Sequence, residues 1–468
     1  MGISIGLDIA VKALRAHQLA VDVASHNLAN ATSPGFSRQR VLLRPLGIDG
    51  SDHFTRDALL GRTGFGVDAS DVNRVRDIFL DYQQRQALGQ RTQSETQAQA
   101  LEKAELVFND PSDDGLAAML AQFWNAWHDV VNDPEGSAAR TTLVHTTTTL
   151  ASRIQRAHSN LTKQRDDLNY QVDAMGLRIN AIADELAQLN FQVKQVELSG
   201  EMANDLRDRR DLLLDQLAEI GNIDVTEESD HTVTVKLGNH DLVSGAQSYA
   251  VEVVGDGGTP EMKNLQFVSD GVAVDVSSGE LRGLLDARDT DMPALIAKLD
   301  TLAAKLIESV NTLHKTGYGL DDLAGPPGPE RDFFSGTGAA DIALHADLLS
   351  DPNKIAAAGG AGKPGDGSVA LQIAELQMQA TLGTQTFEEY YSSMVAVLGA
   401  DVSRVQGLAA SNQLLTNHLE AMRQSVQGVN IDEEVANLHA AQYAYQAAAR
   451  VITTIDEMLD TLINRMAV

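Results

Sequence analysis

Apolar residues recur at every seventh position at both ends of the chain, and this pattern limits the folds that the chain can adopt. An α-helix with such a repeat presents one narrow apolar stripe, which a partner helix must cover. We therefore expect the two terminal helices to pair as a coiled coil and to pack in a polymer rather than in a closed core. The seam positions are Leu7, Leu14, Val21 and Leu28 at the N-terminal end, and Leu438, Tyr445, Ile452, Leu459 and Met466 at the C-terminal end.

Local signals set the inner limits of these two helices. The Ser-Pro-Gly sequence at 33–35 ends the first helix close to residue 30, since proline and glycine interrupt helical hydrogen bonding. At the other end, Asn430 stands three residues before Glu433, which is the spacing of a helix N-cap and its capping partner. We therefore expect the last helix to begin near Ile431.

Two long apolar seams lie inside the chain. In the first, apolar residues alternate in steps of four and three from Leu168 to Val196, and the pattern extends back to Leu150. At the helical rise of about 1.5 Å per residue, positions 150–196 form a rod of roughly 70 Å. The second seam covers residues 391–429. Because neither stripe is stable in water, we expect these two helices to pair with each other.

Other segments of the second half are less regular. Asp401 and Asn412 interrupt the second seam, and we expect them to fix the register between helices, as polar seam residues do in coiled coils. A shorter helix is expected over residues 292–313. Residues 317–370 are rich in glycine and proline, so we expect mostly loop there.

The period of the apolar pattern changes to two over residues 222–284. Valines alternate with polar residues at 233–237, at 251–253 and again at 272–276, with glycine-containing turns between them. This alternation predicts short antiparallel strands in one small β-domain. About 60 residues are marginal for independent stability, so we expect this β-domain to depend on the helical part.

Composition excludes several classes of function. The chain of 468 residues has a formal net charge of −29, which disfavours binding to nucleic acid or to an anionic membrane. It contains no cysteine, so disulfides and thiolate metal sites are excluded. No apolar run of about 18 residues exists, and we expect no membrane insertion. The amphipathic N-terminal segment is not typical of a cleaved signal peptide, so any export is expected to retain it.

Motifs of catalytic and metal-binding chemistry are incomplete in this sequence. No His-Glu-x-x-His motif occurs among the twelve histidines. A loop beginning at Asp110 resembles the start of a calcium loop, but Ala121 stands where the bidentate glutamate belongs. An acidic N-cap before a helix at 116–131 explains this loop better. Pro364 follows Gly362-Lys363, so no phosphate loop forms. We expect no catalytic residue, no cofactor and no metal.

The two ends of the chain resemble the flagellar axial proteins, the family of rod, hook and hook-associated proteins. The N-terminal resemblance rests on a signature at 25–39, and the C-terminal resemblance on residues 428–462. Ser33 and Phe36 differ mildly from the usual threonine and tyrosine of the signature. The signature residues that the resemblance marks are Asn27, Asn30, Pro34, Gly35 and Phe36.

Within this family, the middle of the chain is similar to the hook-associated members. The similar segments are 108–115, 123–127, 204–211 and 333–341. The resemblance implies a secreted, extracellular structural subunit at the junction between hook and filament, on which filament assembly depends. The alternatives are another axial subunit, flagellin-like or hook-like, and a secreted flagellar protein with an enzymatic insertion. The short insertion at 222–284, which has no catalytic constellation, argues against the last alternative.

The resemblance and the periodicities together give an expected architecture and expected partners. We expect a mainly α, elongated multidomain protein with a small antiparallel β insertion facing outward. The expected divisions are a terminal coiled-coil domain (1–60 and 430–468), a long-helix bundle (61–221 and 285–429) and an outer β-domain (222–284). The implied partners are copies of the chain itself, hook protein, hook-associated protein 3 and an export chaperone at the C-terminal helix.

Overall fold

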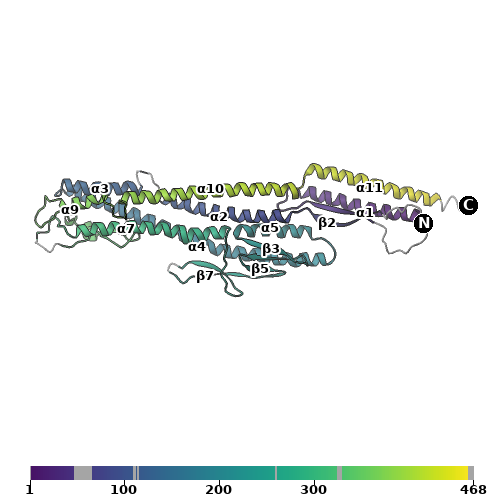
Figure 1. Cartoon of the computed structure of the whole chain (residues 1–468), viewed down its shortest axis with the longest axis horizontal. Helices are drawn as coiled ribbons and strands as arrows, with labels where there is room; N and C mark the ends of the chain where they lie inside the picture. The colour runs from purple at the N-terminus through teal and green to yellow at the C-terminus, as the bar shows by residue number, and fades with distance from the viewer. Residues whose placement is uncertain are drawn as a thin grey trace.

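The chain forms a long rod of helices, as a computed structural model shows for residues 2–46, 66–108, 112, 115–258, 261–323 and 329–461 (Figure 1). The helices are α1 (Gly2–Ala29), α2 (Ile78–Phe108), α3 (Leu116–Asn132), α4 (Ser137–Leu198), α5 (Asn204–Ile220), α6 (Glu280–Asp286), α7 (Met292–His314), α8 (Ala346–Ser350), α9 (Ser368–Glu375), α10 (Phe387–Gln427) and α11 (Ile431–Asp460). The strands are β1 (Gln39–Pro45), β2 (Val67–Arg74), β3 (Ile223–Glu227), β4 (Val233–Leu237), β5 (His240–Ser244), β6 (Gln247–Ser248), β7 (Val251–Gly255), β8 (Lys263–Phe267), β9 (Phe334–Ser335) and β10 (Ala343–Leu344). The expected fold class, mainly α with a small β insertion, is confirmed.

Helices α1 and α11 pair in antiparallel directions at one end of the rod, as predicted (Figure 1). Gly6 lies against the Ile455 side chain, and Asn27 lies against Glu434 at the opposite end of the pair. The last helix begins at Ile431 because the side chain of its N-cap, Asn430, accepts hydrogen bonds from the first backbone N–H groups of the helix. The antiparallel hairpin β1–β2 packs on α1 and completes this unit, which we call the terminal coil.

The expected pairing of the 150–196 and 391–429 helices is wrong. Helix α10 instead runs antiparallel along α2, a helix that the sequence analysis did not identify. The buried seam of α2 has heptad spacing, but its members are small or polar as well as apolar: Leu80, Ala87, Ser94, Leu101 and Phe108. Asn412 donates to the Gln90 carbonyl and to Ser94 Oγ, both at 3.1 Å, and so acts across the two helices as expected. Asp401 pairs with Arg404 of its own helix instead.

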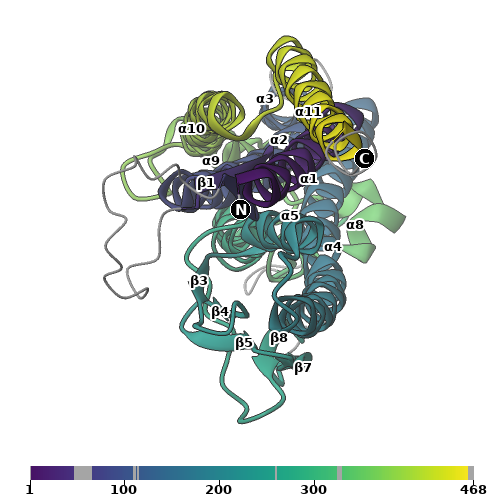
Figure 2. The same cartoon turned by 90° about the vertical axis from the view of Figure 1, so that its right-hand side faces the viewer.

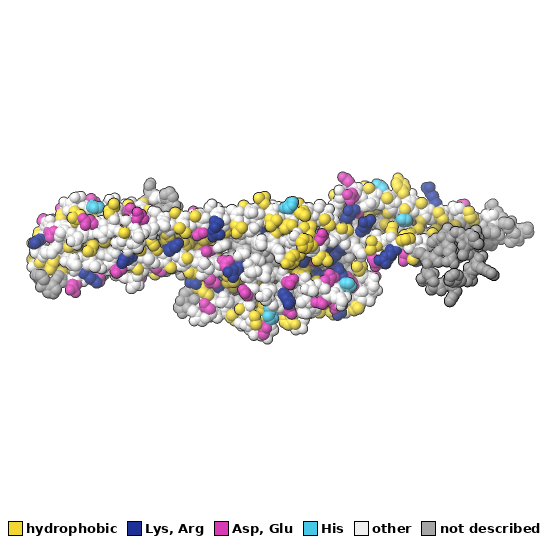
Figure 3. All heavy atoms as spheres, in the orientation of Figure 1, with side chains coloured by type: hydrophobic (Ala, Val, Ile, Leu, Met, Phe, Trp, Pro, Cys, Tyr) yellow, Lys and Arg dark blue, Asp and Glu magenta, His cyan; other side chains and the backbone are white. Residues whose placement is uncertain are grey.

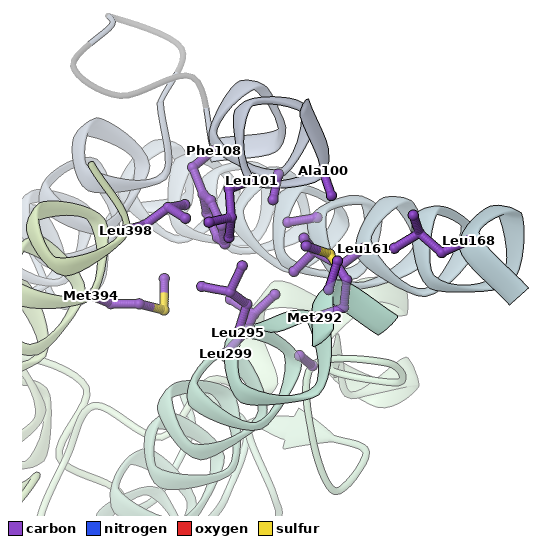
Figure 4. Close-up of a cluster of buried hydrophobic side chains, with 14 of the residues drawn as sticks. Ala100, Leu101, Phe108, Leu161, Leu168, Met292, Leu295, Leu299, Met394 and Leu398 are labelled. Atoms are coloured by element: carbon purple, nitrogen blue, oxygen red, sulfur yellow. The ribbon is translucent and has the colours of Figure 1, made fainter. Parts of the chain in front are cut away.

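Helix α4 has 62 residues and packs on α3, α5 and α7. Side chains from α2, α4, α7 and α10 meet in one core, where Phe108, Leu161, Leu295 and Met394 lie close together (Figure 4). At the far end of the rod a cluster of buried aromatic residues closes the core. It consists of Phe123, Trp124, Trp127, Phe333, Phe334 and Phe387.

Of the two expectations for this end of the rod, one is confirmed and one is wrong. Residues 317–370 are mostly irregular in the described part, as expected, and Phe333 and Phe334 anchor them in the core. The N-cap of helix α3 is Gly115, which has no side chain, so the expected acidic N-cap is wrong; Asp110, Asp113 and Asp114 lie outside the described residues. The burial of Phe123, Trp124 and Trp127 holds this helix in place.

The β insertion consists of a four-stranded sheet, β3-β4-β5-β6, and a separate pair, β7-β8, all antiparallel. The expected strand at 272–276 is wrong, because this segment makes only a single bridge, between Ala273 and Gln266. Three asparagines of α4 bind the insertion. Asn169, Asn180 and Asn190 each accept a bond from a strand backbone N–H and donate to a backbone carbonyl. The insertion therefore packs on α4, as expected.

Candidate functional site

Among the residues that the structure describes, no group of three or more His, Cys, Asp or Glu side chains could hold a metal ion. No helix among them is long and apolar enough to cross a membrane. The surfaces with functional potential are those of the terminal coil and of its joint to the rod.

The predicted seam residues are only half-buried in the single chain. This holds for Leu7, Leu14, Val21 and Leu28 in α1, and for Leu438, Tyr445, Ile452 and Leu459 in α11. Met466 lies outside the described residues. The fully buried positions between the helices are small, chiefly Ala10, Ala24, Ala441 and Ala448. Small residues let the helix axes approach closely, and the larger seam side chains therefore remain partly open.

Helix α11 also carries exposed apolar side chains outside this seam. Tyr443, Val451 and Met458 are exposed on the side of the helix away from the seam, and Ile431 is exposed at its start. The terminal coil thus has apolar side chains in contact with solvent both in the seam and outside it.

The signature residue Asn27 connects three elements of the terminal coil. Its side chain accepts from the Gln39 N–H (2.9 Å) and donates to the Gln39 carbonyl (2.8 Å), so it binds β1 as a neighbouring strand would. Its amide also donates to Glu434 of α11 (3.1 Å), which in turn pairs with Arg38 (2.7 Å). Asn27 and Glu434 are buried, and such a pair is costly to leave without partners.

The other signature residues form the turn that follows α1. Asn30 donates to the His26 carbonyl (3.1 Å) and closes the end of the helix. Gly35 has φ +76°, a left-handed conformation, and a Cβ there would lie 3.3 Å from Leu212 Cβ of α5. Phe36 packs edge-on against His26, whereas Pro34 is exposed. Glycine at 35 therefore allows the turn to lie directly on α5.

An ion-pair network joins the terminal coil to the rod. Its centre is Asp211 of α5, which accepts from Arg74 at 2.8 Å, from Arg76 and from Arg85 at 3.3 Å. Burial alone would raise the pKa of Asp211, but Arg76, Arg74 and Arg85 hold it well below its usual range. The network continues through Arg85 to Asp215, which also pairs with Arg423 of α10.

Burial and pairing with arginine shift the pKa of Asp208 in the opposite direction to that of its neighbour Asp211. It accepts from the Ser37 N–H (2.9 Å) and from Arg74 (2.8 Å). Burial nevertheless raises the pKa of Asp208, because these bonds do not fully offset its desolvation. The two carboxylates thus fasten β2 and the signature turn to one face of α5.

Residues 204–211 were expected to matter only through their resemblance to hook-associated proteins, and the network was not predicted. A signal was present, because Asp208, Asp211 and Asp215 have spacings of three and four and so share one helix face. The arginines that meet them come from β2, from the connection between β2 and α2, from α2 and from α10. Nothing in the sequence indicated that these distant segments meet.

Comparison with known proteins shows similarity to flagellar hook-associated proteins along nearly the whole chain. Residues 101–334, half of the chain, match the family described as "Flagellar hook-associated protein FlgK helical domain", and residues 423–466 match "Flagellar basal body rod FlgEFG protein C-terminal". Flagellar hook-associated protein 1 of Bacillus subtilis (strain 168) is 29 % identical over 515 residues, covering 99 % of this chain and 98 % of that protein. The protein of that name from Escherichia coli (strain K12) is 24 % identical over 556 residues, covering 97 % and 98 %.

A solved structure shares the fold. The flagellar hook junction protein FlgK from Burkholderia pseudomallei superposes with a TM-score of 0.66 at 15 % sequence identity. The superposition covers 74 % of this chain and 100 % of that chain. The long helices and small sheets described above are therefore an arrangement already seen in a solved structure.

Proposed function

The chain belongs to the flagellar hook-associated protein 1 (FlgK) family, and we propose that its terminal coil is the part that is built into the junction between hook and filament. As a member of this family it is a structural protein of the extracellular bacterial flagellum and not an enzyme. It assembles there with other axial subunits.

The observation that carries the proposal is the unsatisfied apolar surface of the terminal coil. The seam side chains, from Leu7 to Leu459, are half-buried, and α11 has further apolar side chains exposed outside the seam. In a helical array of copies, both surfaces meet neighbouring coils and lose their contact with water. The signature residues have a different role, since they fix the angle between the coil and the rod.

The proposed partners follow from this position in the array. Copies of the chain lie on either side, hook protein lies below, and hook-associated protein 3 lies above. Before assembly, the exposed face of α11 is available to an export chaperone. The bundle formed by α2, α4, α7 and α10 then makes the next layer, and the β insertion at 222–284 faces outward.

A charge in the seam tests the proposal. Ile452→Asp places a carboxylate where neighbouring coils exclude water, whereas Thr453→Asp places the same group at the adjacent exposed position. We expect both variants to be secreted and to melt at the temperature of the unmodified chain. In cells that lack the native gene, Ile452→Asp should leave hooks without filaments by electron microscopy, and Thr453→Asp should restore filaments. Filaments of normal length on the Ile452→Asp variant would refute the proposal.

A further inference from the structure

Helix α4 carries a second line of heptad positions that is exposed in the described part of the chain. Only Lys263, which lies over the Tyr170 ring, and Ser248, which donates to Asp184, contact it from the β insertion. The members are Tyr170, Ala174, Leu177, Ala181, Asp184, Gln188, Phe191, Gln195 and Leu198, and we call this line the α4 stripe. Its four large side chains, Tyr170, Leu177, Phe191 and Leu198, are between 53 % and 74 % exposed. The buried seam of the same helix is offset from the α4 stripe by two residues, so the two lie on different sides of the helix. A regular apolar stripe on the outside of a helix is typical of helix–helix docking.

Helix α10 carries a comparable surface. Leu408, Leu415, Met422 and Val426 are between 41 % and 49 % exposed, and we call them the α10 stripe. They remain open because α10 packs chiefly on α2 over this stretch, which covers only part of the seam. Hydrophobic side chains are visible along the upper edge of the rod, over α10 (Figure 3).

The two stripes lie at the same height along the rod. Arg178 of α4 pairs with Glu280 (3.2 Å), and the neighbouring Gly279 N–H donates to the Gly89 carbonyl (2.9 Å). The next residue of α2, Gln90, accepts from Asn412 of α10. This series of contacts places residue 178 level with residue 412. Leu177 is therefore level with the stretch of α10 between Leu408 and Leu415.

Their directions and positions also match. Helices α4 and α10 both run toward the terminal coil (Figure 1), and they lie on different sides of the rod when it is viewed end-on (Figure 2). A rotation about an axis parallel to the rod preserves both height and direction. Such a rotation brings the α4 stripe of one molecule against the α10 stripe of the next, with the two helices parallel.

Charges beside the stripes are complementary at these heights. The side chain of Arg404, which pairs with Asp401 of its own helix, is 64 % exposed next to the α10 stripe, at the height of the exposed Asp167 at the start of the α4 stripe. Opposite charges across an interface favour this register over shifted ones.

We propose that the α4 stripe packs on the α10 stripe of a second copy of this chain, so that neighbouring copies contact each other laterally in the junction. The two surfaces differ, so the contact is heterologous and continues from copy to copy as a ring or helical row. This inference rests on the proposed function and names the surfaces that neighbouring copies use above the terminal coil.

The absence of native cysteine makes a disulfide test unambiguous. Ala181→Cys and Leu415→Cys place two exposed thiols at the same height on the two stripes. The matched control combines Ala181→Cys with Val272→Cys, which is exposed on the β insertion. Each full-length variant replaces the native gene, and flagella are isolated, oxidised and separated without reductant. A disulfide forms only where Cα atoms come within about 7 Å, so the test pair should give a ladder of covalent oligomers, and the control pair and both single variants should give monomers.

Three results would overturn the inference. Flagella that assemble normally but give no ladder would show that the stripes do not meet. Dimers from the single Ala181→Cys variant would indicate that α4 contacts itself about a two-fold axis. A photoreactive residue at Leu177 that captures another flagellar protein, and not this chain, would identify a different occupant.

Two further measurements are needed. One distinguishes a loss of folding from a loss of docking, and the other distinguishes a failure of this inference from a failure of the proposed function. Leu177→Asp with Phe191→Asp should keep the melting temperature and lose filament assembly, whereas the exposed Leu349→Asp on α8 should keep both. Filament growth with this double variant would count against the stripes. Failure of the unmodified chain to restore filaments would count against the proposed function itself.

Discussion

Replacing Asp211 with asparagine should loosen the joint between the terminal coil and the rod. The carboxylate accepts from Arg74, Arg76 and Arg85, and its side chain is only 15 % exposed. Removing one partner of a buried ion pair costs about 3–5 kcal/mol, because the remaining charge stays buried without compensation. Each arginine here keeps a second carboxylate partner. We therefore expect the free energy of unfolding to fall by about 3 kcal/mol, the lower limit of that range.

Urea unfolding followed by circular dichroism measures this loss. Glu185→Gln is the control, because it removes an ion pair with the exposed Arg209 and should cost less than about 1 kcal/mol. Asp208→Asn should cost less than Asp211→Asn, because burial already raises the pKa of Asp208 toward its neutral form. A loss for Asp211→Asn no larger than that for Glu185→Gln would refute this reasoning.

The remaining predictions concern acid stability, the β insertion and the signature turn. Because the pKa of Asp211 is lowered in the folded chain, the unfolded chain binds more protons, and this residue's contribution is complete above the ordinary aspartate pKa and lost as pH falls. The unmodified chain should therefore lose more stability than Asp211→Asn between about pH 5 and pH 2, as acid titration of the unfolding midpoint will show. Asn190→Ala removes the bonds to Val233 and Gly245 and should destabilise the insertion by about 2 kcal/mol, seen as faster hydrogen exchange in β4 and β5; unchanged exchange would contradict this. Gly35→Ala should cost about 1 kcal/mol through its positive φ, and an unchanged unfolding midpoint would show that the turn adapts.

The sequence predicted those elements whose apolar pattern is strong. The terminal helices, the long α4 and α10 helices and the strand at 233–237 all carry regular periods, and each was expected close to its observed position. Helix α2 was missed because Ala87 and Ser94 occupy seam positions that usually hold large apolar residues. As a result, α10 was assigned the wrong partner. Segment 272–276 alternates like a strand but makes only one bridge to the sheet.

The joint was less predictable than the helices. Asn27 and Gly35 were marked by resemblance, yet their roles depend on Gln39, Glu434 and Leu212, which are distant in the sequence. Ion pairs between residues that are distant in the sequence produce no periodic pattern from which they could be predicted. The α4 stripe, in contrast, is regular in the sequence, but only the structure shows that this side of the helix is uncovered.

We propose that the terminal coil enters the axial structure and that the β insertion faces outward. Electron cryomicroscopy of isolated hook–filament junctions tests this arrangement most directly, because it locates both parts by their distance from the flagellar axis. We predict that α1 and α11 lie at the smallest radius, packed against copies of themselves, and that residues 223–267 lie at the largest radius. A junction in which the β insertion lines the inner wall and the terminal coil faces solvent would contradict the account.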